Sequence, residues 1–295
     1  MALAALSGDE QCIIFSQLCN VLDSRIAVAF SSASSELRAL THALLQQLRS
    51  DHEAAAALCR KLGMRSCKEL REAKKVQVMG KGLTGAELAL LGTLGSVLPA
   101  LEELIFISIW CPLRTTHPDG LRRLFEGLGA GALPAMTELN LRAIHTGDAG
   151  ASALAAALGR GALPRLKILF LSNAAIGDAG LVALAPALRR PAPEALYLQG
   201  NPFGDEGLAA LLAPPPPAGA VPPPTGGLAK LKQLYLNGTQ VTDAGCAALA
   251  AALGNGALPA LTTLSLHVIP ASAAAKAAVD EALAMSVERR VASRS

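Results

Sequence analysis

Leucines recur along much of the chain with a spacing of three and then two residues, in the pattern L-x-x-L-x-L. Four variable residues, an apolar residue, the short motif G/T-D-A/E-G and an apolar run follow each of these segments. The alternating leucines predict a short strand with one buried face, and the apolar run predicts a helix. The pattern therefore predicts a strand–helix unit that is repeated along the chain.

The unit recurs at nearly regular intervals. Clear copies begin at Met136, Leu166, Pro193, Leu231 and Leu261, and weaker copies begin at Lys74 and Leu101. The clear copies start 30, 27, 38 and 30 residues apart. No single unit can bury its apolar face alone, so neighbouring units must stack to complete a common core. We therefore expect an α/β solenoid of about six to seven strand–helix repeats.

Two short motifs mark the ends of the predicted helices. An aspartate stands just before the helical run of four copies, as Asp148, Asp178, Asp205 and Asp243. A carboxylate at this place is expected to cap the free N–H groups of its helix. The sequence G-A-L-P at 131–134, 161–164 and 256–259 is expected to end the preceding helix, because proline cannot continue it.

These motifs resemble the leucine-rich repeats of the ribonuclease-inhibitor type, over residues 71–284. The resemblance implies a partial horseshoe that binds a protein partner on the concave face of its parallel sheet. At the position where this family carries Asn, Cys or Thr, the chain has Asn201 and Thr239 but also Ile144, Ala174 and Ile269. The hydrogen-bond ladder of the loops is therefore expected to be incomplete.

The residue between the two later leucines points to the concave face, because side chains alternate along a strand. Read through the chain, this position holds Gln77, Ile105, Asn140, Phe170, Tyr197, Tyr235 and Ser265. Flanking positions on the same face hold Arg142, Ser172, Gln199, Asn237 and His267. Aromatic side chains ringed by polar ones are typical of a protein-binding hot spot. The alternative is that strands simply favour aromatic residues at half-exposed positions.

We therefore predict a partner-binding set on the concave face. Its members are Phe170, Tyr197, Tyr235, Asn140, Arg142, Gln199 and Asn237.

Residues 1–70 lack the repeat and predict a small helical module. Ser7 and Glu10 have the spacing of a capping box, and the helix that they open would place Ile14, Leu18, Val21 and Leu22 on one face. A second helix is expected from about Ser35 to Leu62.

The spacing L6-x7-I14-F15-x2-L18, followed by Asp23 and L37-R-A-L40, resembles the F-box. That family docks on the Skp1 adaptor of cullin-type ubiquitin ligases. The resemblance implies that Leu6, Ile14, Phe15 and Leu18 face such a Skp1-like adaptor. The family usually has Pro where Ser7 stands and often has Trp where Leu37 stands. The alternative is a helical cap that covers the open edge of the first repeat, as solenoids require.

Composition narrows the range of functions. Hydrophobic residues make up 52% of the 295 residues and charged residues 17%, which excludes wholesale disorder. The net charge of +3 is too small to predict a nucleic-acid partner. The six cysteines lack zinc-site spacing, so we expect free thiols in a reducing compartment and no metal. No segment predicts a membrane span or a signal peptide.

The five histidines have no motif partner, and no nucleophile or phosphate-binding motif is present. We therefore expect no catalytic residues, no cofactor and no enzymatic activity. The favoured function is a protein-interaction scaffold, in one version an F-box-like substrate receptor. The alternative is a regulator of a small GTPase or of an enzyme, since the repeat type also resembles Ran GTPase-activating proteins.

The remaining expectations concern organisation and location. A proline-rich insertion at 213–227 interrupts the array, and a flexible C-terminal tail is expected over 285–295. We also expect a monomer in the cytoplasm, with the nucleus as the alternative location.

Overall fold

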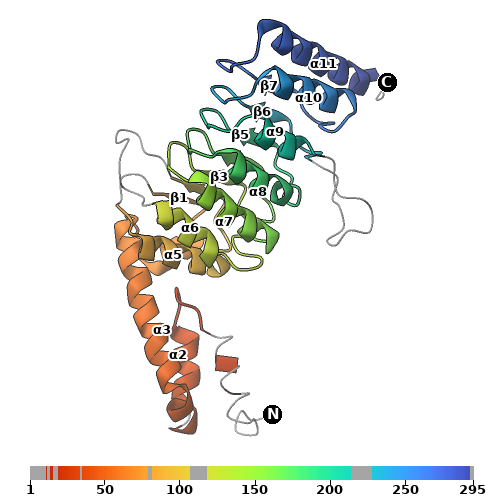
Figure 1. The fold of residues 1–295 in the computed structure, drawn as a ribbon. Coiled ribbons are helices and arrows are strands. Elements are labelled where there is room, and N and C mark those ends of the chain that lie inside the picture. The colour runs from red at the N-terminus through yellow and green to blue at the C-terminus, as the bar shows by residue number, and fades with distance from the viewer. Residues whose placement is uncertain are drawn as a thin grey trace. The chain divides into compact units, whose positions relative to one another are not determined.

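The computed structural model describes residues 11, 14–15, 19–33, 35–78, 82–106, 118–213 and 228–292. Leu6, Leu18 and nearly all of the proline-rich insertion lie outside these residues, so the predictions made for them stay predictions. The chain divides into two compact units (Figure 1). Unit 1 comprises Met1–Ala73 with Val97–Pro99, and unit 2 comprises Lys74–Ser96 with Ala100–Ser295.

Unit 1 is helical, with α2 at Arg25–Ser32, α3 at Ser35–Lys61 and α4 at Cys67–Glu72. The long helix predicted from Ser35 is confirmed as α3. The prediction that Val21 and Leu22 lie on a helix is wrong, because both lie in a turn. The side chain of Asn20 accepts the Leu22 N–H at 2.9 Å, and such local bonds compete with helix formation.

A small apolar core holds unit 1 together. Phe15, Ala27 and Leu48 are buried, and the rings of Phe15 and Phe30 lie 6.1 Å apart. Between α2 and α3, the buried hydroxyl of Thr41 donates to that of Ser31 at 2.8 Å. These contacts join α2 to α3.

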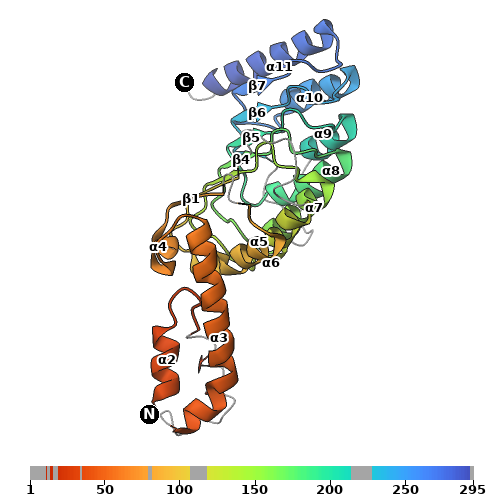
Figure 2. The ribbon, with the colours of Figure 1, turned by 90° about the vertical axis from the view of Figure 1, so that its left-hand side faces the viewer.

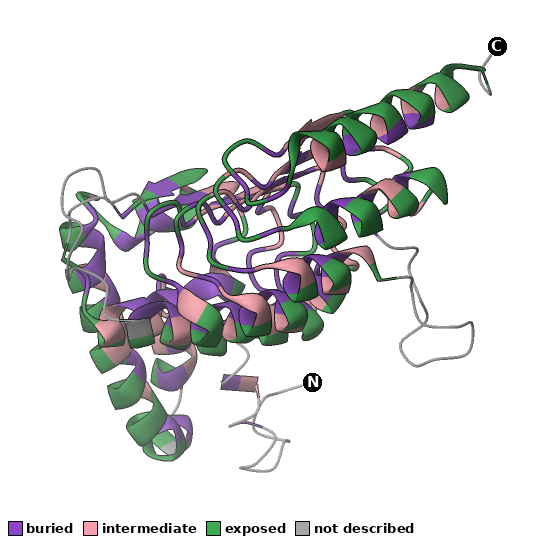
Figure 3. Cartoon of the chain, turned by 45° about the horizontal axis from the view of Figure 1, so that its top comes forward, coloured by how far each residue is buried: buried purple, intermediate pink, exposed green. Residues whose placement is uncertain are grey.

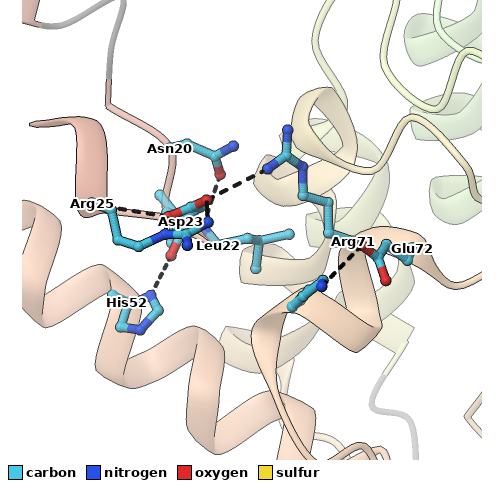
Figure 4. Close-up of polar contacts among 9 residues, drawn as sticks. Asn20, Leu22, Asp23, Arg25, His52, Arg71 and Glu72 are labelled. Carbon is cyan, nitrogen blue, oxygen red and sulfur yellow. Dashed lines mark hydrogen bonds and ion pairs between the residues drawn. The ribbon is translucent and has the colours of Figure 1, made fainter.

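Polar contacts attach the turn before α2 to α3 and α4 (Figure 4). Asp23 accepts from Nε and Nη2 of Arg25 at 2.8 and 2.6 Å, and Arg71 of α4 lies 3.9 Å away. His52 Nδ1 of α3 lies 2.6 Å from the carbonyl of Val21. The hydrogen bond from Arg25, with the charge of Arg71, holds the pKa of Asp23 well below its usual range.

Unit 2 is built on a seven-stranded parallel sheet whose strands follow chain order. The strands are β1 at Lys75–Gln77, β2 at Glu103–Ile105, β3 at Glu138–Asn140, β4 at Ile168–Phe170, β5 at Ala195–Tyr197, β6 at Gln233–Tyr235 and β7 at Thr263–Ser265. The leucine in the middle of β2 to β6 is buried, as the pattern predicts. The alternating leucines therefore set which face of each strand joins the core.

The helices cover one face of this sheet. They are α5 at Gly85–Thr93, α6 at Pro118–Gly127, α7 at Gly147–Gly159, α8 at Asp178–Leu188, α9 at Asp205–Leu212, α10 at Asp243–Gly254 and α11 at Ala273–Ala292, and a short 3-10 helix, η2, spans Leu94–Val97. Consecutive helices pack side by side from α5 to α11 (Figure 2). Their buried residues face the sheet, and their exposed residues face outward (Figure 3).

The repeated aspartates cap the helix of the next repeat, which corrects the prediction that each would cap its own. Oδ1 of Asp148 in α7 accepts the N–H groups of Gly177 and Gly180, at 2.7 and 3.1 Å, where α8 begins. Asp178 in turn accepts from Gly204 and Gly207, at 2.8 and 2.7 Å, where α9 begins.

The same bond recurs in the two following repeats. Asp205 accepts from the backbone of Thr242 at 2.9 Å and from its hydroxyl at 2.6 Å, and Asp243 accepts from the backbone of Ser272. Each carboxylate therefore satisfies N–H groups at a helix N-terminus and joins two repeats in one interaction.

The glycine of the G/T-D-A/E-G motif is required by this carboxylate. A Cβ on Gly207 would lie 2.9 Å from Oδ1 of Asp178, and one on Gly180 would lie 2.5 Å from Oδ1 of Asp148. Both distances are shorter than van der Waals contact. Aspartate in one repeat and glycine in the next are therefore parts of one interaction.

Asn201 makes a second link between repeats. Its Oδ1 accepts from the backbones of Ala174 and Ile176 at 3.1 and 3.0 Å, and its Nδ2 donates to the carbonyls of Leu171 and Leu198. The side chain is 1% exposed, so these bonds satisfy groups that water does not reach.

The flexible tail expected from residue 285 is wrong over the part that the structure describes, because α11 continues to Ala292. Arg289 donates to the carbonyl of Gly254 at 2.9 Å, and Arg290 donates to those of Pro259 and Leu261. These carbonyls belong to the end of α10 and the segment after it. The arginines thus bind carbonyls that lack a helical partner and hold the last turns of α11 in place.

Removing the carboxylate of Asp178 should destabilise unit 2. Asp178→Ala leaves the N–H groups of Gly204 and Gly207 without their acceptor, so we expect a loss of about 1–2 kcal/mol in denaturant unfolding. Gly207→Ala should also destabilise, because its Cβ meets Asp178 and Leu181. Gly159→Ala is the matched control, since its Cβ would meet nothing within 4 Å.

The double variant Asp178→Ala/Gly207→Ala separates this interaction from general helix effects. Without the carboxylate the new Cβ has more room, so the double variant should lose less stability than the sum of the two single variants. Strictly additive losses would contradict the assignment of Gly207 to the Asp178 interaction.

Candidate functional site

The third residues of the seven strands form one row across the sheet. Parallel pairing places these residues in register in the order Gln77, Ile105, Asn140, Phe170, Tyr197, Tyr235 and Ser265. They lie on the sheet face opposite the buried leucines, which is the face predicted to be concave, and we keep the name concave face for it. Ile105 differs from its neighbours in the row because it is buried.

Phe170, Tyr197 and Tyr235 stack on one another, and we call these three residues the aromatic ladder. The ring centroids of Phe170 and Tyr197 lie 4.3 Å apart with an interplanar angle of 19°. Those of Tyr197 and Tyr235 lie 4.5 Å apart with an angle of 7°. All three residues are half-buried. The ladder therefore presents aromatic surface to solvent in a rigid arrangement.

The hydroxyl of Tyr197 donates to Oε1 of Gln233 at 3.2 Å. Gln233 is the first residue of β6, so this hydroxyl points toward the beginning of the strands. Burial, with the neighbouring Tyr235, raises the pKa of the Tyr197 hydroxyl above its usual value. The phenol therefore stays neutral at physiological pH and serves as a hydrogen-bonding group.

The polar residues predicted beside the ladder play different roles. Oδ1 of Asn237 accepts from the hydroxyl of Ser265 at 2.7 Å and from the N–H of His267 at 2.8 Å, so it orders the sheet edge. Oδ1 of Asn140 accepts the N–H of Arg142 at 3.2 Å, and Arg142 itself is exposed.

Two oxygens next to the ladder have no hydrogen-bond partner among the described residues. They are Oγ of Ser172 and Oε1 of Gln199, and both atoms are buried. Ser172 follows Phe170 by two residues and Gln199 follows Tyr197 by two, and both lie in the turns after β4 and β5. Buried polar atoms of this kind normally find a partner.

Charged side chains occupy the first residues of β1, β2 and β3, on the same face as the row. Lys75 Nζ lies 2.6 Å from Glu103 Oε2, and Glu138 has a hydrogen bond with the side chain of Asn140 and lies within the influence of the Lys75 charge. Desolvation, with the nearby charge of Glu103, raises the pKa of Glu138. The sequence analysis did not single out Glu138. Its place on the concave face could have been predicted from the sequence, because the first and third residues of a strand share a face.

A shallow hollow of about 520 Å³ lies where the chain enters the middle strands. Its lining includes Glu102, Arg165, Lys167, Glu194 and Lys230. Glu194 accepts a charged hydrogen bond from Lys232 at 2.7 Å, which lowers the pKa of its carboxyl. The charges of Lys167 and Lys230, which line the hollow, also lower this pKa.

Of the four residues predicted to face an adaptor, the structure describes Ile14 and Phe15, while Leu6 and Leu18 lie outside the described residues. Phe15 is 0% exposed and packs in the core of unit 1, so its side chain does not face an adaptor surface. The sequence resemblance placed it outward, and the packing of Phe30 and Leu45 around it is the physical reason for the difference. Ile14 is half-buried.

Within the described ranges, no group of three or more His, Cys, Asp or Glu side chains could hold a metal ion. No helix in the same ranges is long and apolar enough to cross a membrane. Cys59 and Cys67 are buried free thiols with their sulfurs 3.9 Å apart, and burial raises the pKa of Cys59 to about 12.

A family model described as Leucine Rich repeat matches residues 164–185, 194–212 and 227–250. These segments cover three consecutive strand–helix units, and with the parallel sheet they define the fold as a leucine-rich-repeat solenoid. Domains of this kind generally mediate protein–protein interactions and are typically non-enzymatic. No curated protein matches the sequence.

Two solved structures resemble the chain weakly. Leiomodin-1 actin-binding site 2 is 17% identical, with 60% of this chain and 92% of that chain covered and a TM-score of 0.45. An internalin from Listeria monocytogenes is 15% identical, with 78% and 92% covered and a TM-score of 0.18. TM-scores of this size carry nothing about what this chain binds.

Replacing the carboxylate of Glu138 should stabilise unit 2 at neutral pH, because desolvation and the charge of Glu103 outweigh its contacts with Lys75 and Asn140. A raised carboxyl pKa means that the folded chain binds this proton more readily than the unfolded chain, so the charged form opposes folding. We expect Glu138→Gln to raise Tm at pH 7, with the gain vanishing below the ordinary glutamate pKa of 4.5.

Thermal unfolding followed by circular dichroism between pH 3.5 and 7.5 measures this effect. Glu103→Gln is the matched control, because it removes a paired carboxylate and should not raise Tm at pH 7. A Tm for Glu138→Gln that falls below wild type at pH 7 would contradict the assignment.

Proposed function

We propose that this chain is a non-enzymatic protein-interaction scaffold that holds a protein partner on the concave face of its repeats. The aromatic ladder is the observation that carries the proposal. Three of the few aromatic residues of the chain, which make up only 3% of its composition, stand in consecutive repeats on the uncovered face. Stacked aromatic rings with polar neighbours resemble the centre of a protein-binding surface.

Packing of the core does not account for aromatic side chains at the ladder positions. The helices bury the opposite face of the sheet, where leucines complete the core. The ladder lies on the face that needs no aromatic side chain for folding, and Ser172 and Gln199 beside it retain unpartnered polar atoms. A partner that covered this face would bury the exposed parts of the three rings.

The chain is expected to act in the cytoplasm or the nucleus, where its described cysteines would remain free thiols. Regulation of a small GTPase or of an enzyme is compatible with the same surface, because such regulators also bind proteins through their repeats. No residue of the described surface suggests a catalytic contribution to that regulation.

Removal of the ladder tests the main proposal. We expect the variant Phe170→Ser/Tyr197→Ser/Tyr235→Ser to lose the partners that affinity mass spectrometry recovers with the wild-type chain. Its half-buried positions should tolerate the change, which circular dichroism checks. Val182→Ser/Met285→Ser is the control, because it removes exposed apolar side chains from the helices and should retain every partner.

If the ladder variant folds and still recovers every wild-type partner, the concave face is not the binding site. If the control loses the same partners, the loss does not belong to the ladder. Either result would overturn the proposal.

We further propose that unit 1 binds a Skp1-like adaptor, as in an F-box-like substrate receptor. Apolar side chains exposed on this unit support the proposal, since Leu40 and Leu44 stand one turn apart on α3 and are 46% and 39% exposed. Ile26 on α2 is 60% exposed. Exposed apolar side chains grouped on helices suit docking to another helical protein.

A pull-down with the purified adaptor tests this second proposal. The full chain should retain the adaptor, and Leu40→Ser/Leu44→Ser should lower the retained amount about tenfold or more. Met285→Ser, an exposed apolar change in unit 2, should leave retention unchanged. Absence of retention by the wild-type chain would leave unit 1 as a helical module without this role.

A further inference from the structure

The hollow at the beginning of the middle strands lies beside a turn that is shorter than its neighbour. The buried Leu169 of β4 follows the buried Leu158 of α7 by eleven residues, whereas Leu196 of β5 follows Leu188 of α8 by only eight. Pro191 of this short turn lines the hollow, which has a volume of about 520 Å³. The missing residues therefore leave room beside the longer turn before β4.

Most of the charged side chains that line the hollow are cations. Arg165 and Lys167 come from the turn before β4 and Lys230 from the turn before β6, while the carboxylates of the lining are those of Glu102 and Glu194. All three basic residues are exposed, and none forms an ion pair within the described part of the chain. The hollow therefore presents three cations without a matching carboxylate.

The two carboxylates of the lining are neutralised by lysines outside it. Lys74 Nζ lies 3.1 Å from Oε1 of Glu102, and Lys232 Nζ lies 2.7 Å from Oε2 of Glu194. Five cations therefore surround two carboxylates at this place. The excess of three positive charges equals the net charge of +3 of the whole chain, so the charge of the chain is concentrated at the hollow.

Neither the backbone nor the next carboxylate along the sheet matches these cations. The carbonyls of Thr137, Lys167 and Glu194 each accept two N–H groups of the following repeat, so the backbone around the hollow is paired within the sheet. The pKa of Glu138 responds to charged residues of β1 and β2, which lie on its other side. An occupant would therefore be recognised through the basic side chains, and it would be anionic.

The spacing of the cations favours more than one anionic group. Arg165 and Lys230 each stand four residues before the central leucine of their strand, and β5 lies between these two strands. Strands are about 4.8 Å apart, so the two backbones are separated by about 10 Å. Acidic side chains a few residues apart in one peptide segment match this separation. A nucleic-acid backbone needs a longer basic track, on the order of six to ten phosphate contacts.

The hollow is close enough to the aromatic ladder for one partner to reach both. Phe170 follows Lys167 by three residues, which is about 10 Å along a strand. The hydroxyl of Tyr197 points toward the same end of the strands, at Gln233. An extended segment of twelve residues is about 40 Å long and would span the distance several times over.

We propose that the protein partner held on the concave face carries an acidic segment, with at least two Asp or Glu side chains, that binds in the hollow through Arg165, Lys167 and Lys230. This inference rests on the proposed function, since it names the chemistry of the same partner. The rings of the ladder supply apolar contact, and the cations fix the end of the strands toward which the acidic segment points.

Selection from a library of random twelve-residue peptides, displayed on phage, tests the inference with the full-length chain. Peptides that bind the variant Lys167→Gln/Lys230→Gln are removed first, and those that bind the wild-type chain are then retained. We expect the enriched peptides to share at least two acidic residues. They should bind the control variant Arg49→Gln/Arg123→Gln like wild type, because it removes two exposed cations of α3 and α6 instead.

A thermodynamic cycle on one synthesised peptide then locates the acidic residues. Replacing them with Asn or Gln should weaken binding to the wild-type chain about tenfold. Lys167→Gln/Lys230→Gln should weaken binding of the acidic peptide by a similar factor and leave binding of the amide peptide unchanged. The ladder variant Phe170→Ser/Tyr197→Ser/Tyr235→Ser should also weaken binding of the acidic peptide.

Glu194→Gln should act in the opposite direction. It removes a carboxylate of the lining and releases Lys232 from its ion pair, so the acidic peptide should bind about threefold more tightly than to wild type. A variant that merely disturbed the fold would not strengthen binding.

The possible outcomes separate this inference from the proposed function. The inference is overturned if no peptide depends on Lys167 and Lys230, if the dependent peptides share no acidic residues, or if Glu194→Gln weakens their binding. Acidic peptides that bind the ladder variant as tightly as wild type also overturn it, because the hollow would then act apart from the concave face. In each of these cases the recovery of partners by the ladder variant still decides the proposed function on its own.

Discussion

The capping of one repeat by the aspartate of the preceding repeat is the interaction on which unit 2 depends. Because the carboxylates of Asp148 and Asp178 accept N–H groups of the following helix, each helix begins at a fixed offset from its neighbour. That offset in turn brings the strands into register. The carboxylate lies so close to the glycine of the next helix that a Cβ there would clash with it. The distance between neighbouring repeats is therefore closely fixed.

The binding surface follows from this register. Ring stacking at 4.3 and 4.5 Å requires that Phe170, Tyr197 and Tyr235 stand opposite one another on adjacent strands. A shift of one residue in any repeat would turn an aromatic side chain into the core. The core and the concave face are therefore specified together, since the leucines between these positions bury the other face.

Most of the fold of unit 2 could be predicted from the sequence, because the leucine spacing and the period are local signals that repeat. The role of Asp178 could not, since its sequence context does not show that Gly204 and Gly207 of the next repeat lie within hydrogen-bond distance. The ladder row was predictable from alternation. The contacts of Glu138 were not, because they depend on which carboxylate Lys75 reaches across the sheet. In unit 1, the side chain of Asn20 accepts the Leu22 N–H, a local bond that competes with the helix expected there.

The ladder also contains both tyrosines of the chain, and so all of its tyrosine absorption. Tyr197 and Tyr235 are its only two tyrosines, and Trp110 is its only tryptophan. In a Trp110→Phe background, tyrosine emission would come from these two stacked rings alone. Their near-parallel arrangement at 4.5 Å couples their electronic transitions, so the tyrosine part of the near-ultraviolet dichroism would report on this surface. The two tyrosines are therefore an intrinsic chromophore at the proposed binding surface.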